Sequence, residues 1–267
     1  MKPVSRAGEH HGRSIATVLV CHLLLVAAAG LALAAACAFE PQGEGRVAAV
    51  IDARSFRLED GREIRLSGIE PARSEKAKDN SALSAVIAGR EVTLRGQDDT
   101  PDRYGRQSAF VFLASSEIPV QAELLARGEA LVSASVIDKD CALVLTSAEA
   151  RGREGRQGIW SDPAAAIKNA ESPGDILAGI GRFTIIEGKV LSVRQAGATT
   201  YLNFGRNWTR DFAVTISRRT LPAFEAAGVA LKSLENRRIR VRGWVEAHTG
   251  PRIEALHVGQ IELLGGN

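Results

Sequence analysis

The feature that most constrains the fold is a fixed succession of four short segments between Arg46 and Trp160. In these segments, apolar residues at the spacing typical of a strand or a helix lie next to a turn that contains charged residues or glycine. Because the segments follow one another in a set order and spacing, they restrict how the intervening chain can be connected. They comprise residues 47–55 (VAAVIDARS), 64–70 (IRLSGIE), 102–106 (DRYGR) and 150–160 (ARGREGRQGIW).

The patterning around these segments predicts a small barrel with helices packed outside it. Alternating apolar residues indicate strands, and apolar residues three or four positions apart indicate helices. The predicted strands are 46–51, 55–58, 63–69, 91–95 and 108–113, and the predicted helices are 81–88, 120–127 and 142–151, with residues 40–45 as a Pro/Gly linker before the first strand. This order predicts a mainly β (α+β) fold built on a five-stranded barrel of the oligonucleotide-binding type.

Taken together, the four segments resemble the staphylococcal-nuclease-like (thermonuclease) family. The resemblance implies that residues 39–162 form a nuclease-like domain with this barrel fold. It also implies metal-assisted phosphodiester hydrolysis with calcium as the cofactor. That chemistry needs carboxylates to hold the cation, a carboxylate to act on the attacking water, and guanidinium groups to neutralise charge on the phosphate.

Several of the residues that this chemistry needs are replaced. In the family the first acidic turn reads Asp-Gly-Asp-Thr and its second Asp is a calcium ligand, whereas here Asp52 is kept and Arg54 stands at the ligand position. In the next block the family has Gly-Ile-Asp-x-Pro-Glu, in which the Asp is a metal ligand and the Glu acts on water. Here Glu70 stands at the first of these positions and Arg73 at the second. Arginine cannot act as a base, because its guanidinium is not deprotonated in proteins.

The two arginines that the family uses for phosphate are present as Arg65 and Arg106, and Tyr104 matches the tyrosine of the phosphate pocket. A structural role is the alternative, with Arg65 paired to a carboxylate on the barrel rim and residues 104–106 kept as a turn. Losing a single electrostatic stabiliser of a transition state costs on the order of 100- to 1,000-fold in rate. We therefore predict a degenerate site that needs no cofactor.

The alternative function is a calcium-dependent phosphodiesterase or endonuclease. In that case Asp52 and Glu70 would hold the metal, and Arg65 and Arg106 would contact the phosphate. Glu75 could replace the missing base only if its loop rearranged.

A second unit follows a predicted linker at residues 163–180. Its predicted strands are 183–193, 199–204, 212–216, 238–246, 252–256 and 261–264, with one helix at 219–227 after the third strand. This order predicts a second small barrel of the oligonucleotide-binding type over residues 181–267. It resembles the C-terminal extension of some bacterial thermonuclease-family proteins through residues 201–205 (YLNFG) and 208–212 (WTRDF).

The two units have opposite charge. Residues 39–180 contain 18 Lys and Arg against 23 Asp and Glu, whereas residues 181–267 contain 13 against 7. An acidic barrel is poorly suited to bind a polyanion unaided. The basic unit could bind single-stranded nucleic acid or another polyanion, dock onto the acidic unit, or bind another protein of the cell envelope.

Aromatic and arginine residues carry the prediction of nucleic-acid binding, because aromatic rings stack on bases while arginines follow the backbone. Alternate residues 238, 240 and 242 would share one strand face as a basic stripe, although such alternation is typical of any half-exposed strand. Phe183, Phe212 and Trp244 are expected in the core. The candidate contact residues are Tyr104, Tyr201, Arg206, Trp208, Arg210, Arg238, Arg240 and Arg242.

The N-terminal residues 1–38 are predicted to be a signal peptide or membrane anchor. A basic start precedes the apolar run 15–39, which contains small residues suited to cleavage. The protein is therefore expected to be periplasmic or secreted, or anchored in the inner membrane by this segment alone. Cys21 and Cys37 lie in or at the edge of the segment, so Cys141 is the one cysteine certain to remain. We therefore expect no disulfide framework and a structural role for Cys141.

Overall fold

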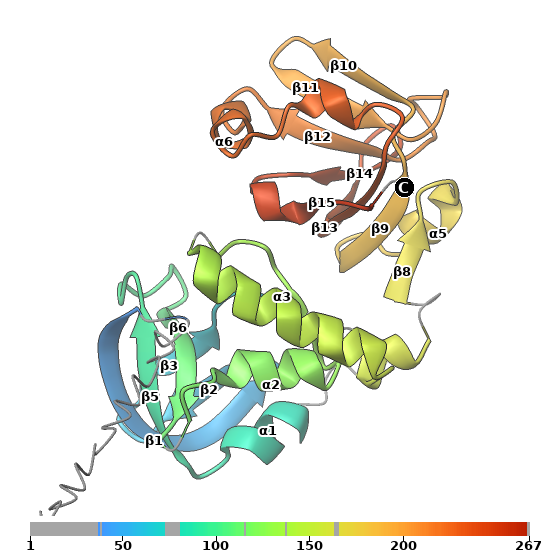
Figure 1. Ribbon diagram of the computed structural model, residues 1–267. Coiled ribbons are helices and arrows are strands. Elements are labelled where there is room, and N and C mark those ends of the chain that lie inside the picture. Colours follow the sequence, from blue (N-terminus) through green and yellow to red (C-terminus); the bar gives the residue numbers. More distant parts are fainter. Residues whose placement is uncertain are drawn as a thin grey trace, which may run out of the picture. The chain divides into compact units, whose positions relative to one another are not determined.

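The computed structural model describes residue 37 and residues 39–72, 81–114, 116–136, 138–162 and 166–265 (Figure 1). The predicted leader, apart from residue 37, lies outside these residues, as do Arg73 and Glu75. In the part of the chain that is described, none of the helices combines the length and the hydropathy needed to cross a membrane.

The first barrel is a closed ring of five strands, as predicted. The ring order is β1 (Glu40–Asp52), β2 (Ser55–Leu58), β3 (Glu63–Leu66), β6 (Arg106–Leu113) and β5 (Glu91–Gly96). β1 pairs twice, first with β5 through its N-terminal half and then with β2 through its C-terminal half. β3 and β6 are parallel, and the other neighbours are antiparallel.

The prediction of a linker at residues 40–45 was wrong, because these residues form the first half of β1. Proline and glycine disfavour strands on average. Here the pairing with β5 supplies the hydrogen bonds, and the register shifts between Pro41 and Gly43. Gly43 has a φ of 107°, a conformation open to glycine, so the strand accommodates the irregularity at this position.

Three helices pack outside the first ring, namely α1 (Ser81–Ile87), α2 (Val120–Ala126) and α3 (Lys139–Glu154) (Figure 1). α3 begins at Asp138, whose carboxylate accepts a hydrogen bond from the Cys141 N–H at 2.7 Å. Two short strands, β4 (Ile69–Pro71) and β7 (Ala130–Val132), pair beside the ring. Side chains of the ring and of the helices share one core, which includes Phe56, Ile64, Leu94, Leu125 and Leu145.

A disulfide joins Cys37 to Cys141 across a sequence separation of 104 residues. The expectation of no disulfide was wrong. Cys37 had been assigned to the export segment, yet the chain places it against the start of α3, and both cysteines are fully buried in the first core. Proximity in the fold, which spacing along the chain does not reveal, decides this pairing.

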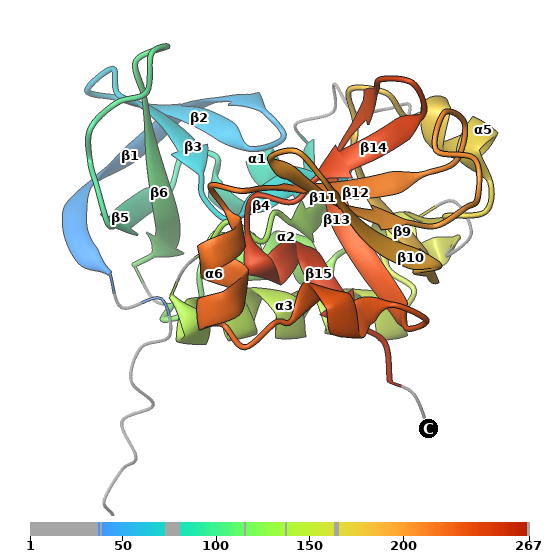
Figure 2. The ribbon, with the colours of Figure 1, turned by 90° about the horizontal axis from the view of Figure 1, so that it is seen from above.

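The second unit repeats the same strand order. It contains β9 (Phe183–Lys189), β10 (Ser192–Ala196), β11 (Thr199–Asn203), β12 (Ala213–Ser217), β13 (Arg238–Ala247) and β14 (Pro251–Glu254). β10 pairs with β11, β11 with β12, β12 in parallel with β14, β14 with β13, and β13 with β9. Since β9 runs into β10 through Val190 and Leu191, the two together correspond to the doubly paired β1 of the first ring (Figure 2).

The second sheet, which has eight strands and also includes β8 and β15, therefore shares the strand connectivity of the closed first ring, an oligonucleotide-binding-type barrel, and is called the second ring below. The helix α6 (Leu221–Ala226) follows the third strand of the second ring, as α1 follows that of the first. The second core includes Leu202, Phe212, Val214, Phe224 and Ile253. The last strand, β15 (Ile261–Leu263), pairs with β13.

Residues 166–180 were predicted to be a linker and instead belong to the second unit. They form β8 (Ile167–Asn169), which pairs in parallel with β9, and α5 (Pro173–Leu177), whose Ile176 is buried in the second core. A small apolar cluster joins this region to the first unit through Leu131, Trp160, Ala166 and Ile185. The linker was predicted from the mixed Ala/Pro/Gly composition of residues 163–180, which does not indicate these contacts.

Candidate functional site

The first candidate site is a pocket of about 380 Å³ at the first barrel. The turn between β1 and β2 places Arg54 at its wall, β3 contributes Arg65, and β4 contributes Glu70. Arg54 and Glu70 form an ion pair, and their side chains are only 16% and 12% exposed. The Arg54 guanidinium also donates to the backbone oxygen of Ile69 at 3.4 Å. A cation of the protein itself thus neutralises Glu70.

Asp52, the other candidate metal ligand, lies at the exposed end of β1. One of its carboxylate oxygens accepts a hydrogen bond from the Arg54 N–H at 2.9 Å, which fixes the turn. The carboxylate also lies close enough to Arg106 to help raise the pKa of that guanidinium. Asp52 is thus held by a backbone amide and lies in the field of Arg106, whereas Glu70 is paired directly with a guanidinium.

Arg65 differs from its neighbours because, within the described chain, it forms no ion pair. Burial lowers the pKa of Arg65, and the nearby Arg54 and Arg106 cations lower it further. An anion entering beside Arg65 would relieve this repulsion. The nearby Glu70 and Asp102 carboxylates act in the opposite direction and raise the pKa of Arg65.

Arg106, at the start of β6, is held by the turn before it. Its guanidinium donates two hydrogen bonds to one oxygen of Asp102, at 3.0 and 2.8 Å. This contact lowers the pKa of Asp102 to about 2 and raises the pKa of Arg106. The ring of Tyr104 lies 4.9 Å from the Arg106 guanidinium and is 65% exposed. The fold thus places Arg106 near Arg65 and against the ring of Tyr104.

The described residues around this pocket, which do not include Arg73 and Glu75, do not fit a calcium ion. Calcium takes six to eight oxygen ligands, with carboxylates prominent among them. In the described residues, no group of three or more His, Cys, Asp or Glu side chains is arranged to hold a metal. Asp52 and Glu70 both contact Arg54, whose positive charge would repel the ion.

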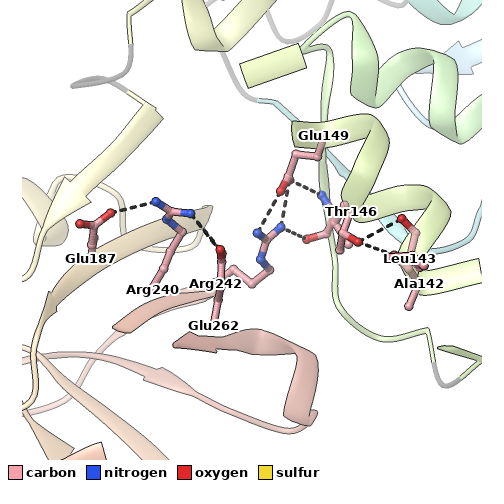
Figure 3. Close-up of polar contacts among 9 residues, drawn as sticks. Ala142, Leu143, Thr146, Glu149, Glu187, Arg240, Arg242 and Glu262 are labelled. Carbon is pink, nitrogen blue, oxygen red and sulfur yellow. Dashed lines mark hydrogen bonds and ion pairs between the residues drawn. The ribbon is translucent and has the colours of Figure 1, made fainter. Parts of the chain in front are cut away.

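The predicted basic stripe on β13 is not a free cationic surface. Arg238 contacts Glu187 of β9. Arg240 contacts both Glu187 and Glu262 of β15 (Figure 3). Arg242 is 5% exposed and lies against α3 of the first unit. The stripe prediction was wrong because the residues that neutralise it come from other strands and from α3.

The sequence prediction did not identify Glu149, which is the carboxylate partner of Arg242. Its carboxylate accepts hydrogen bonds from Arg242 at 2.9 Å and from the Val132 N–H at 2.8 Å. Arg242 also donates to the Val132 carbonyl at 3.1 Å (Figure 3). A glutamate on the inner side of a helical pattern was the available signal, because a buried carboxylate needs a partner.

The second candidate site is a groove of about 990 Å³ on the second barrel. Of the predicted contact residues, Tyr201, Arg206 and Trp208 line this groove, whereas Arg210 does not. Sequence reasoning missed three further basic residues in the lining, namely Arg194, His248 and Arg252. Trp208 is 72% exposed, while Trp244, which was expected in the core, is 39% exposed and meets the edge of Phe183.

A five-stranded oligonucleotide-binding-type ring with helices packed outside and an arginine-lined pocket defines the nuclease-like class of barrel. Residues 63–162 match the family model described as staphylococcal nuclease homologue. The chain therefore contains a staphylococcal-nuclease-like domain, which confirms the resemblance inferred from the four sequence segments. No curated protein matches the chain.

Proposed function

We propose that this chain is an exported nuclease-like protein that binds nucleic acid or another anionic partner without cleaving it. The observation that carries the proposal is the ion pair between Arg54 and Glu70. It supplies from within the protein the positive charge that a catalytic cation would provide. A guanidinium cannot activate a water molecule as a bound metal does.

Anion binding is supported by Arg65, which the described ion pairs leave without a carboxylate partner. Export is supported by the leader sequence and by the bond between Cys37 and Cys141, since disulfides persist mainly in oxidising compartments. These two properties describe a binding protein of the cell envelope or of the exterior.

The test uses the exported chain with its disulfide formed. A fluorescent single-stranded oligonucleotide is titrated at two salt concentrations, with and without calcium, and the products are separated on a gel. We expect binding that weakens as salt rises, because cations on the protein release counterions from the nucleic acid, and an intact oligonucleotide in every lane. Calcium-dependent cleavage would overturn the proposal.

The second candidate function is a calcium-dependent phosphodiesterase. It is favoured by one observation, the retention of Arg65 in the pocket wall with Arg106 and Tyr104 nearby. The double variant Arg54→Asp, Arg73→Glu restores the family residues at both positions. It should gain calcium-dependent cleavage if these two changes alone silence the site. Arg57→Asp controls for the charge reversal of one arginine, since it makes the same change as Arg54→Asp at a half-exposed side chain of β2.

A further inference from the structure

We infer that the groove on the second barrel binds single-stranded nucleic acid. This inference rests on the proposed function in one respect, that the partner is anionic. The site itself lies in the second barrel, whereas the proposed function was argued from the first. The groove is the larger of the two pockets described above, at about 990 Å³. It is lined by aromatic rings, by arginines and by the backbone of two loops.

The floor and one wall of the groove come from a single face of the sheet. Arg194, Tyr201 and Thr215 lie opposite one another on β10, β11 and β12. Because side chains alternate along a strand, Leu202 and Val214 on the other face are buried in the core. Thr215 is small and 4% exposed, and it lines the groove beside Tyr201.

The loop after β11 carries Trp208 at the edge of the groove and is held in place. Asp211 accepts a hydrogen bond from the Asn207 N–H at 2.8 Å, and Asn207 accepts hydrogen bonds from Thr209 at 3.1 and 2.6 Å. Gly205 packs directly on Asp211, where a Cβ would clash. The indole is therefore exposed on an ordered loop, a suitable platform for a nucleobase.

The charges of the groove fit a phosphodiester backbone. In the described part of the chain, Arg194 and Arg206 form no ion pair. The Asp211 carboxylate is engaged within its own loop, and Arg252 is paired with Glu246. Arg194 lies near enough to Glu235 to help lower the pKa of that carboxyl. The groove thus offers Arg206, together with the partly neutralised Arg194, beside Tyr201 and Trp208, which combines stacking with backbone contact.

The position of the groove in the ring agrees with this reading. Arg252 lies opposite the first residue of β12, just as Arg106 lies opposite the first residue of β3. Thr215 is the third residue of its strand, as Arg65 is of β3. The groove therefore occupies in the second ring the place that the phosphate-binding arginines occupy in the nuclease-like ring. In this register Tyr201 takes the place of Ser55, and Arg194 takes the place of Asp52.

The test compares Trp208→Ala, Tyr201→Ala and Arg206→Ala with Lys189→Ala. The Lys189 side chain is exposed on the same barrel and does not line the groove, so its loss controls for one positive charge. Labelled oligo-dT and oligo-U of about ten nucleotides, a length within the range that one such barrel covers, are titrated against the full exported chain. The two oligonucleotides distinguish DNA from RNA as the source of the ligand.

We expect Trp208→Ala to weaken binding by on the order of 10-fold, the effect of losing one stacked base. Arg206→Ala should reduce the slope of log affinity against log salt by about 0.7, the value for one phosphate contact on a single strand. Lys189→Ala should bind as the unchanged chain does, and a duplex should compete weakly because its bases are already stacked.

Equal binding by the three groove variants and Lys189→Ala would overturn the inference, as would no binding of either oligonucleotide at low salt. In the second case a protein partner becomes the occupant to seek. These outcomes are separate from the test of the proposed function. Cleavage that persists in Trp208→Ala would overturn the proposed function alone, whereas binding without cleavage that is insensitive to Trp208 would overturn this inference alone.

Discussion

The two barrels of this chain share one strand order and use the same face of it differently. In the first barrel that face carries charged residues that pair mainly with one another, as Arg54 does with Glu70 and Arg106 with Asp102. In the second it carries Tyr201, Trp208 and two arginines without ion pairs in the described residues. The comparison teaches that connectivity fixes where a site lies, while the side chains on that face decide what the site can hold.

The barrels also differ in how they are stabilised, and the largest effect is expected from the disulfide. Cys37→Ser should lower the free energy of unfolding by about 4–5 kcal/mol, because the crosslink restricts a loop of roughly a hundred residues in the unfolded chain. Urea unfolding of the variant and of the reduced chain checks this. An unchanged midpoint in both would show that the first barrel does not depend on the bond.

The next effect concerns the contact between the barrels. Arg242→Met leaves the Glu149 carboxylate buried without its cation, which should cost roughly 3–5 kcal/mol. Arg238→Met is the control, since its side chain is 63% exposed and its loss should cost less than about 1 kcal/mol. The double variant Arg242→Met, Glu149→Leu should recover much of the loss. If Arg242→Met and Arg238→Met lowered the free energy of unfolding equally, the buried pair between Arg242 and Glu149 would not stabilise the contact between the barrels.

A smaller effect is expected from Glu187 in the second barrel. Burial acts to raise the pKa of Glu187, but hydrogen bonds from Arg238 and Arg240 outweigh it and lower that pKa below its ordinary value. Glu187→Gln should therefore cost about 1–2 kcal/mol at neutral pH. A carboxylate with a lowered pKa stabilises the fold above its unfolded pKa and loses that contribution as pH falls through the folded value. The urea midpoints of the unchanged chain and of Glu187→Gln should therefore converge at acidic pH, where Glu187 is protonated.

The smallest effect is a titration in the first barrel. Asp102 should remain ionised until pH falls to about 2, because the Arg106 guanidinium donates to its carboxylate. NMR detection of the carboxyl carbon gives this pKa directly. In Arg106→Gln the pKa should return toward the ordinary value for aspartate, near 4. A pKa near 4 in the unchanged chain would show that the pair is not formed in solution.

Much of the fold could be predicted from the sequence because strand alternation and glycine stops are local signals. The ring strands and the helices α1, α2 and α6 fall close to their predicted ranges. The errors lie where distant contacts override local preference. Residues 40–45 became a strand through pairing with β5, and residues 166–180 became structured through packing on the second core.

The sequence by itself determined the nuclease-like barrel, the second ring and the substitutions at Arg54 and Arg73, since these depend on residue order and spacing. Only the tertiary structure decided that Arg54 pairs with Glu70, that Cys37 bonds Cys141, and that Arg242 is buried against α3. The physical reason is that the role of a charged group or a thiol depends on which group it contacts in the folded chain. Partners separated by many residues meet only when the whole chain has folded.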